Sequence, residues 1–129
     1  MAVDASVGCK ANQQASRQRA ALLVHLRQLA QTDGTQCLPW LIQACETDSR
    51  MLSIHAWLVD QAIFDTTRSK AIRHVKQAVQ WTGSTVSSYA RVDLGWILDA
   101  RTKGARWSAW LIAMALDLGF QLEGPNPYC

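Results

Sequence analysis

The chain has 129 residues, a length that suits one domain with a sizeable hydrophobic core and that is short for two. Hydrophobic residues make up 49% of it, while runs of strand-forming residues bounded by turns are scarce, so the composition excludes a β-rich protein and predicts an all-α fold. The 13 Lys or Arg residues against 10 Asp or Glu give a net charge of +3, which permits a polyanionic partner without requiring one.

The two ends of the chain differ from its middle. Residues 1–15 are polar and short of large apolar side chains, which predicts a flexible N-terminal arm. Residues 16–119 are predicted to form a single helical domain and residues 120–129 an extended tail, because two prolines prevent a helix there. The start of the chain carries Asp4 and lacks the apolar core of a secretory signal, so we expect a cytoplasmic protein without a membrane span.

Apolar side chains at helical spacing predict a compact bundle of about five or six helices. The first helix is closed by Asp33 and Gly34, and the second accommodates Pro39 in its first turn, where the missing N–H costs no hydrogen bond. Asp48 or Ser49 is predicted to cap the third helix. The predicted inward side chains of these helices are Leu22, Leu26, Leu29, Ala30, Leu38, Leu41, Ile42, Cys45, Leu52, Ala56, Val59 and Ile63.

A fourth helix is predicted from about Arg68 to Trp81. Lys70 and Arg73 lie on a different side of this helix from its apolar residues, so they would extend a strip of phosphate contacts. The inward residues are Ile72, Val75 and Val79.

Residues 81–84 are predicted to form a tight turn after this helix. Gly83 can adopt a left-handed conformation at no steric cost, and Ser84 is suited to cap a following helix that ends near Gly95. Such a corner would make the C-terminal half a helix-turn-helix or helix-two-turn-helix module. We predict that Gly83, Ser84 and Thr85 direct backbone amides outward, where a phosphate oxygen can bind.

A basic loop, residues 100–106, precedes a strongly apolar last helix. Its cations are Arg101, Lys103 and Arg106, arranged around a flexible glycine, and such a loop beside a helix terminus can follow a phosphate backbone. Gly119 is predicted to end the last helix. Tryptophans at helical spacing are more often core than base-stacking surfaces, so the predicted buried face consists of Trp107, Trp110, Leu111, Met114 and Leu118.

These motifs resemble those of the actinobacterial integration host factor, a family of small helical nucleoid proteins with a helix-two-turn-helix DNA-binding module. In that family a Gly-Val-Gly-Lys turn opens a helix that ends in Leu-Gly, an Arg-Arg-x-Arg-Gly loop follows, and the final helix carries Ala-Leu. Here residues 81–84 are similar to the turn, Leu94 and Gly95 to the helix end, residues 100–104 to the loop and residues 109–111 to part of the final helix. The resemblance covers about half of the chain.

The resemblance implies a double-stranded DNA-binding protein that is nucleoid-associated, with an architectural or recombination-accessory role and a recombinase or another protein as partner in a nucleoprotein complex. The turn would bind one phosphate, while Arg101, Lys103 and Arg106 would hold the backbone or enter the minor groove. One alternative is a helix-turn-helix transcriptional regulator in which residues 84–91 lie in the major groove. Another is a helical protein-interaction module that does not bind DNA.

Catalytic and metal-binding motifs are not found in the sequence. It contains no GxSxG, HExxH, GxxxxGKS/T or GxGxxG pattern, so we expect neither an enzyme nor a cofactor. The cysteines Cys9, Cys37, Cys45 and Cys129 lack the spacing of zinc ligands, and no metal is expected. Cys37 and Cys45 are predicted to be small buried apolar residues.

Overall fold

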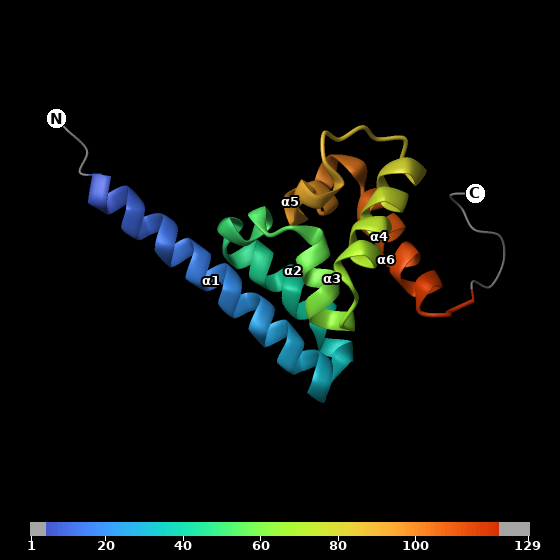
Figure 1. The fold of residues 1–129 in the computed structure, drawn as a ribbon, viewed down its shortest axis with the longest axis horizontal. Coiled ribbons are helices and arrows are strands. Elements are labelled where there is room, and N and C mark those ends of the chain that lie inside the picture. Colours follow the sequence, from blue (N-terminus) through green and yellow to red (C-terminus); the bar gives the residue numbers. More distant parts are fainter. Residues whose placement is uncertain (1–4, 122–129) are drawn as a thin grey trace.

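Helix α1 (Ala5–Thr32) is the longest element of the computed structural model, which describes residues 5–121. Its 28 residues correspond to about 42 Å, and its N-terminal part extends away from the other helices (Figure 1). The predicted flexible arm is therefore wrong for residues 5–15, which are helical because alanine and glutamine favour a helix and no proline interrupts it. Most of the predicted C-terminal tail lies outside the described residues.

Helix α2 (Cys37–Thr47) follows a short 3₁₀ turn, Gly34–Gln36, and helix α3 is Ala56–Phe64. The third helix starts later than predicted, because the Asp48 carboxylate caps a separate 3₁₀ turn, Ser49–Ser53. Residues 54 and 55 are then extended, and the amide of Ala56 donates to Val92 O at 2.9 Å while the amide of Leu94 donates to Ile54 O at 2.9 Å. These two bonds join the start of α3 to the C-terminal half.

Helix α4 (Arg68–Trp81) has the bounds that the sequence predicts, and Gly83 ends it with a φ of 63°. The amide of Gly83 donates to Gln80 O at 3.1 Å and that of Ser84 to Val79 O at 3.0 Å, which is a Schellman motif. This confirms the predicted role of Gly83.

The predicted helix from Ser84 to Gly95 does not form. The chain runs irregularly to a 3₁₀ turn, Tyr89–Arg91, and the short helix α5 is Leu94–Ile97. Asp93 caps α5 by accepting the amide of Trp96 at 2.9 Å, so Gly95 lies inside this helix and does not end it. Serine, threonine and valine between residues 84 and 88 favour extended backbone over helix.

Helix α6 (Ala105–Asp117) packs against α4, which packs against α3, and α3 in turn packs against α1. The described residues contain no strand, so the predicted all-α bundle is confirmed. None of the helices in the described chain is long and apolar enough to cross a membrane. The largest fully buried apolar side chains are Trp110, Leu26, Leu41, Leu94, Ile97, Met114, Val59, Val75 and Cys37.

Candidate functional site

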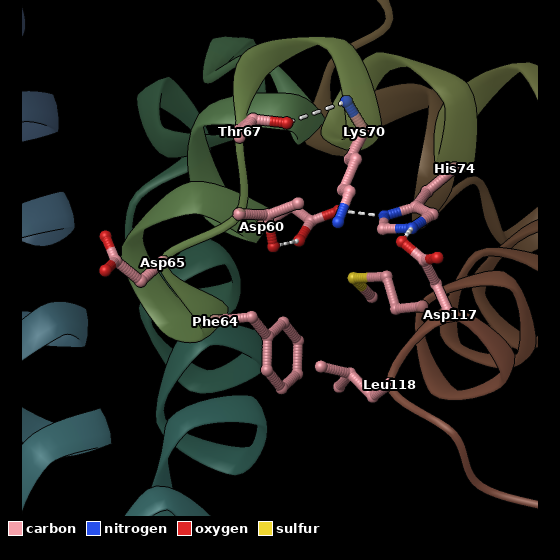
Figure 2. Close-up of a pocket in the computed structure, with 10 residues that line it drawn as sticks. Asp60, Phe64, Asp65, Thr67, Lys70, His74, Asp117 and Leu118 are labelled. Carbon is pink, nitrogen blue, oxygen red and sulfur yellow. Dashed lines mark hydrogen bonds and ion pairs between the residues drawn. The ribbon is translucent and has the colours of Figure 1, made fainter.

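A buried histidine joins the three helices at the centre of the C-terminal half. His74 of α4 is 2% exposed, and its Nδ1 lies 2.5 Å from Oδ2 of Asp60 on α3. Its Nε2 lies 2.7 Å from Oδ2 of Asp117 at the end of α6. Figure 2 shows the two carboxylates approaching the two ring nitrogens from different sides. One side chain thus connects α3, α4 and α6.

The two contacts define the charge on the ring. A neutral imidazole has one N–H, so both carboxylates can accept a hydrogen bond only if His74 is an imidazolium. Burial by itself lowers the pKa of His74, but the hydrogen bonds to Asp60 and Asp117 and their negative charges outweigh it, so the pKa is raised above its usual 6.5. The hydrogen bond from His74 likewise lowers the pKa of Asp117, helped by the charges of Arg73 and Lys70.

A cavity of about 190 Å³ lies beside this cluster. The fully buried Asp60 also accepts the hydroxyl of Thr66 at 2.7 Å, and Lys70 extends into the cavity toward Asp60 and His74 (Figure 2). Because both ring nitrogens of His74 already face carboxylates, the ring has no free lone pair for general-base catalysis. The arrangement is suited to joining α3, α4 and α6 and to sharing the charge of His74 between two carboxylates.

The outer face of α4 is polar and basic. The 14 residues of this helix include four Lys or Arg and no Asp or Glu. The guanidinium of Arg68 lies over the ring of Trp57, 4.9 Å from its centre, and the other three cations of the helix are exposed. Ser69 and Gln80 are also exposed on this helix. We call this surface the α4 basic face; its cations are Lys70, Arg73 and Lys76.

The predicted phosphate-binding turn does not offer the amides that the sequence suggested. The amides of Gly83 and Ser84 are both used in the Schellman motif, and the Ser84 hydroxyl lies 2.9 Å from that of Thr82. Thr85 is exposed in irregular backbone and does not begin a helix. The prediction that this turn presents a row of free amides is therefore wrong for Gly83 and Ser84, because the end of α4 uses them.

The basic loop is partly neutralised by an acid that the sequence reading overlooked. Arg101 donates from Nε and Nη2 to the carboxylate of Asp99, at 3.0 and 2.7 Å, and this hydrogen bonding lowers the pKa of Asp99 to about 2. Arg106 lies over the Trp96 ring, 4.1 Å from its centre, and 3.7 Å from Asp99 Oδ2. Lys103 is exposed and has a φ of 53°. Of the three predicted cations of this loop, Lys103 is the one that neither pairs with Asp99 nor lies over the Trp96 ring.

The predicted site residues do not form one surface. Contacts of Arg73 and His74 with Asp117 place the middle of α4 beside the end of α6. The basic loop precedes α6, so it lies at the other end of that helix, about 20 Å away along its 13 residues. The α4 basic face and the loop are separate positive regions.

Sequence reasoning missed Asp60, His74 and Asp117 as a cluster, although the first two carried a signal. His74 shares a helical face with the buried residues Ala71, Val75 and Ala78, while Asp60 follows the buried Val59 in α3. A titratable side chain on an apolar face needs a partner, but the spacing does not say which one. Lys76 was missed because the predicted strip stopped at Arg73.

No family model, curated protein or solved structure matches this chain. The resemblance to actinobacterial integration host factor stays a prediction from the sequence.

Proposed function

We propose that this chain binds double-stranded DNA mainly through the phosphate backbone, with the α4 basic face as its contact surface. The observation that carries the proposal is that α4 has four cations and no acid of its own, and that Lys70, Arg73 and Lys76 are exposed along it. Phosphate contacts from Lys and Arg supply most of the sequence-independent affinity of DNA-binding proteins. The main contact thus moves from the turn and the loop to α4, where the sequence predicted only an extension of the site at Lys70 and Arg73.

The shape of α4 supports this choice of partner. The helix is about 21 Å long, and cations at positions 70, 73 and 76 recur every three residues along it. The short side chain of Ser69 allows close approach of a backbone, and the exposed residues Ser69, Arg73, Lys76 and Gln80 are all polar, with Ile72 half-buried beside them. Such a polar, positively charged surface fits a phosphate backbone better than an apolar protein groove.

Architectural or recombination-accessory activity in the nucleoid is the biological role that we propose for such binding. Backbone-directed contacts tolerate different sequences, which is what a protein that shapes DNA at many sites requires. Lys103, near the start of α6, would add a second contact region on a long duplex. A recombinase or another protein bound to the same DNA is the proposed protein partner.

A second candidate is supported by a different observation. Leu118 and Phe120 are 52% and 66% exposed beyond the end of α6, and Leu116 is also exposed. The predicted burial of Leu118 is therefore wrong, because α6 ends at Asp117, one residue before it. Exposed large apolar side chains that lie close together favour a helical protein-interaction module. This function would require no DNA.

Binding to two unrelated 30-base-pair duplexes, measured by fluorescence anisotropy over a salt series, tests the proposal. We expect similar affinities for both duplexes and a steep loss of affinity with salt. Exchanging Lys70 and Lys76 for glutamine should lower the salt slope by up to about 2. The matched control exchanges Lys10 and Arg17, exposed cations of α1, for glutamine and removes the same charge.

The outcomes separate the candidate functions. A strong preference for one duplex would indicate a sequence-specific regulator, and an absence of binding at low salt would leave the interaction module. Equal losses in both double variants would show that binding depends on net charge and not on the α4 basic face.

A further inference from the structure

The α4 basic face contains one carboxylate from a neighbouring helix. Asp117, at the end of α6, lies 3.3 Å from a guanidinium nitrogen of Arg73 through Oδ1, while its Oδ2 lies 2.7 Å from His74. The Arg73 and Asp117 side chains are 54% and 31% exposed, so their contact lies at the surface. A single acid thus connects an outward cation of the proposed DNA surface to the buried histidine.

We propose that Asp117 is a built-in competitor for DNA phosphate: it holds Arg73 in the unbound protein, and the proton on His74 determines how strongly it does so. This inference rests on the proposed DNA binding through α4. A phosphate oxygen and the Asp117 carboxylate offer the same acceptor chemistry to a guanidinium. Arg73 therefore has to leave one anion to bind the other, which reduces the net gain from its phosphate contact.

The groups that face His74 explain how its proton affects Asp117. Asp60 of α3 and Asp117 of α6 contact the ring, and Lys70 of α4 enters the same cavity. Asp65 from the α3–α4 turn borders the cavity, but its carboxylate points away from His74 and pairs with Arg27 (Figure 2). When His74 is protonated, the charge of Asp117 is shared between the imidazolium and the two cations of α4 that act on it.

When His74 loses its proton, the charge of Asp117 is no longer shared with an imidazolium. If the remaining N–H of His74 stays with the buried Asp60, the Nε2 lone pair faces Asp117 and repels it. Asp117 is partly exposed and can turn toward Arg73 and Lys70. The charge of Asp117 then acts on these two cations alone, and the α4 basic face offers less positive charge to DNA.

Exchanging Asp117 for asparagine removes the charge while keeping an oxygen that can accept from His74 Nε2. The matched control is Asp48→Asn, because Asp48 also pairs with an arginine, Arg50, at 2.8 Å and lies in a different part of the fold. Each variant removes one negatively charged carboxylate. We expect Asp117→Asn to bind a 30-base-pair duplex about twofold to fivefold more tightly than Asp48→Asn, with a salt slope steeper by about 0.9.

A double-mutant cycle with Arg73→Gln identifies the freed cation. Arg73→Gln should reduce DNA affinity more in the Asp117→Asn background than in the wild type, because Arg73 is no longer held. The effect of pH provides a second test. The affinity difference between wild type and Asp117→Asn should widen as the pH rises through the raised pKa of His74, because His74 then loses its proton.

Nuclear magnetic resonance of the His74 ring provides a readout independent of DNA. Asp117→Asn should lower the pKa of His74, because one of the two carboxylates that favour the imidazolium is gone.

Circular dichroism checks that each variant is folded. If Asp117→Asn is unfolded, the Arg73→Gln variant in the wild-type background becomes decisive. In that case an affinity loss as large as that of Lys76→Gln would overturn the proposal, while a clearly smaller loss supports it.

The outcomes distinguish this inference from the proposed function. If the wild type binds DNA and Asp117→Asn matches Asp48→Asn in affinity and slope, Asp117 is not a competitor and DNA binding through α4 stands. If no variant binds DNA at any salt concentration, the proposed function and this inference both fail.

Discussion

Exchanging Asp60 for alanine is the sharpest test of the buried cluster, because Asp60 is fully buried and has two hydrogen-bond donors directed at it. Its carboxylate accepts from His74 at 2.5 Å and from Thr66 at 2.7 Å. Removing it leaves a buried imidazolium with one carboxylate and a hydroxyl without its acceptor. Breaking a buried charged pair in this way costs about 3–5 kcal/mol. The adjacent cavity of about 190 Å³ can admit water to Thr66, so we expect about 3 kcal/mol.

The measurement is the free energy of unfolding in urea at pH 6, for Asp60→Ala and for a surface control. Arg27→Ala is the control, because it breaks the exposed ion pair of Arg27 with Asp65 at 3.1 Å and should cost about 0.5 kcal/mol. A loss below about 1 kcal/mol for Asp60→Ala would refute the reasoning that the cluster holds α3 to α4.

The same cluster predicts how stability depends on pH. The pKa of His74 is raised in the folded protein, so its stabilising contribution is fully present below the usual value of 6.5 and is lost as the pH rises through the folded-state pKa. Wild-type unfolding free energy should therefore fall from pH 6 toward pH 9, and the difference from Asp60→Ala should narrow. A wild-type stability that rises over this range, or a constant difference between the two proteins, would contradict an imidazolium at His74.

The other predictions concern the turn, the thiols and the loop. Gly83→Val should cost about 1–2 kcal/mol in a urea titration through backbone strain alone, since a Cβ there meets nothing within 4 Å, and an unchanged midpoint would contradict the positive φ. In the folded protein the exposed Cys9 should be alkylated much faster than Cys45, because burial raises the pKa of Cys45 to about 11. Mass spectrometry measures both alkylation rates, and equal rates would contradict the burial of Cys45. Exchanging Arg101 and Lys103 for alanine should lower the salt slope by about 1, not 2, because Arg101 is held by its own carboxylate, and a slope lowered by 2 would restore the loop as the main contact.

The sequence predicted the features that depend on neighbours in the chain. The bounds of α4 follow from its apolar period, and the conformation of Gly83 follows from the need to end that helix. The helix expected after Ser84 was wrong because the Schellman motif uses the amide of Ser84 and Asp93 caps a later, shorter helix. Several residues can serve as a cap, and tertiary packing decides which one does.

The spacing of residues along the chain does not predict the cluster of Asp60, His74 and Asp117. Asp60 and His74 are 14 residues apart, and His74 and Asp117 are 43 apart, so no local motif relates them. Asp60 and His74 stand on otherwise apolar helical faces, which indicates buried polar groups but leaves their partners open. The packing of α3, α4 and α6 has to be known before the three can be placed together.

The composition of α4 and the buried cluster have one electrostatic explanation. Four cations on a helix without an acid repel one another, and a protonated His74 adds a fifth positive charge near the core. Asp60 from α3 and Asp117 from α6 offset this charge from the inner side, so the outer side of α4 can remain free of acids. Replacing either carboxylate by a neutral residue should therefore weaken the fold and strengthen the attraction of the outer face for polyanions, whereas a purely structural cluster would weaken the fold alone.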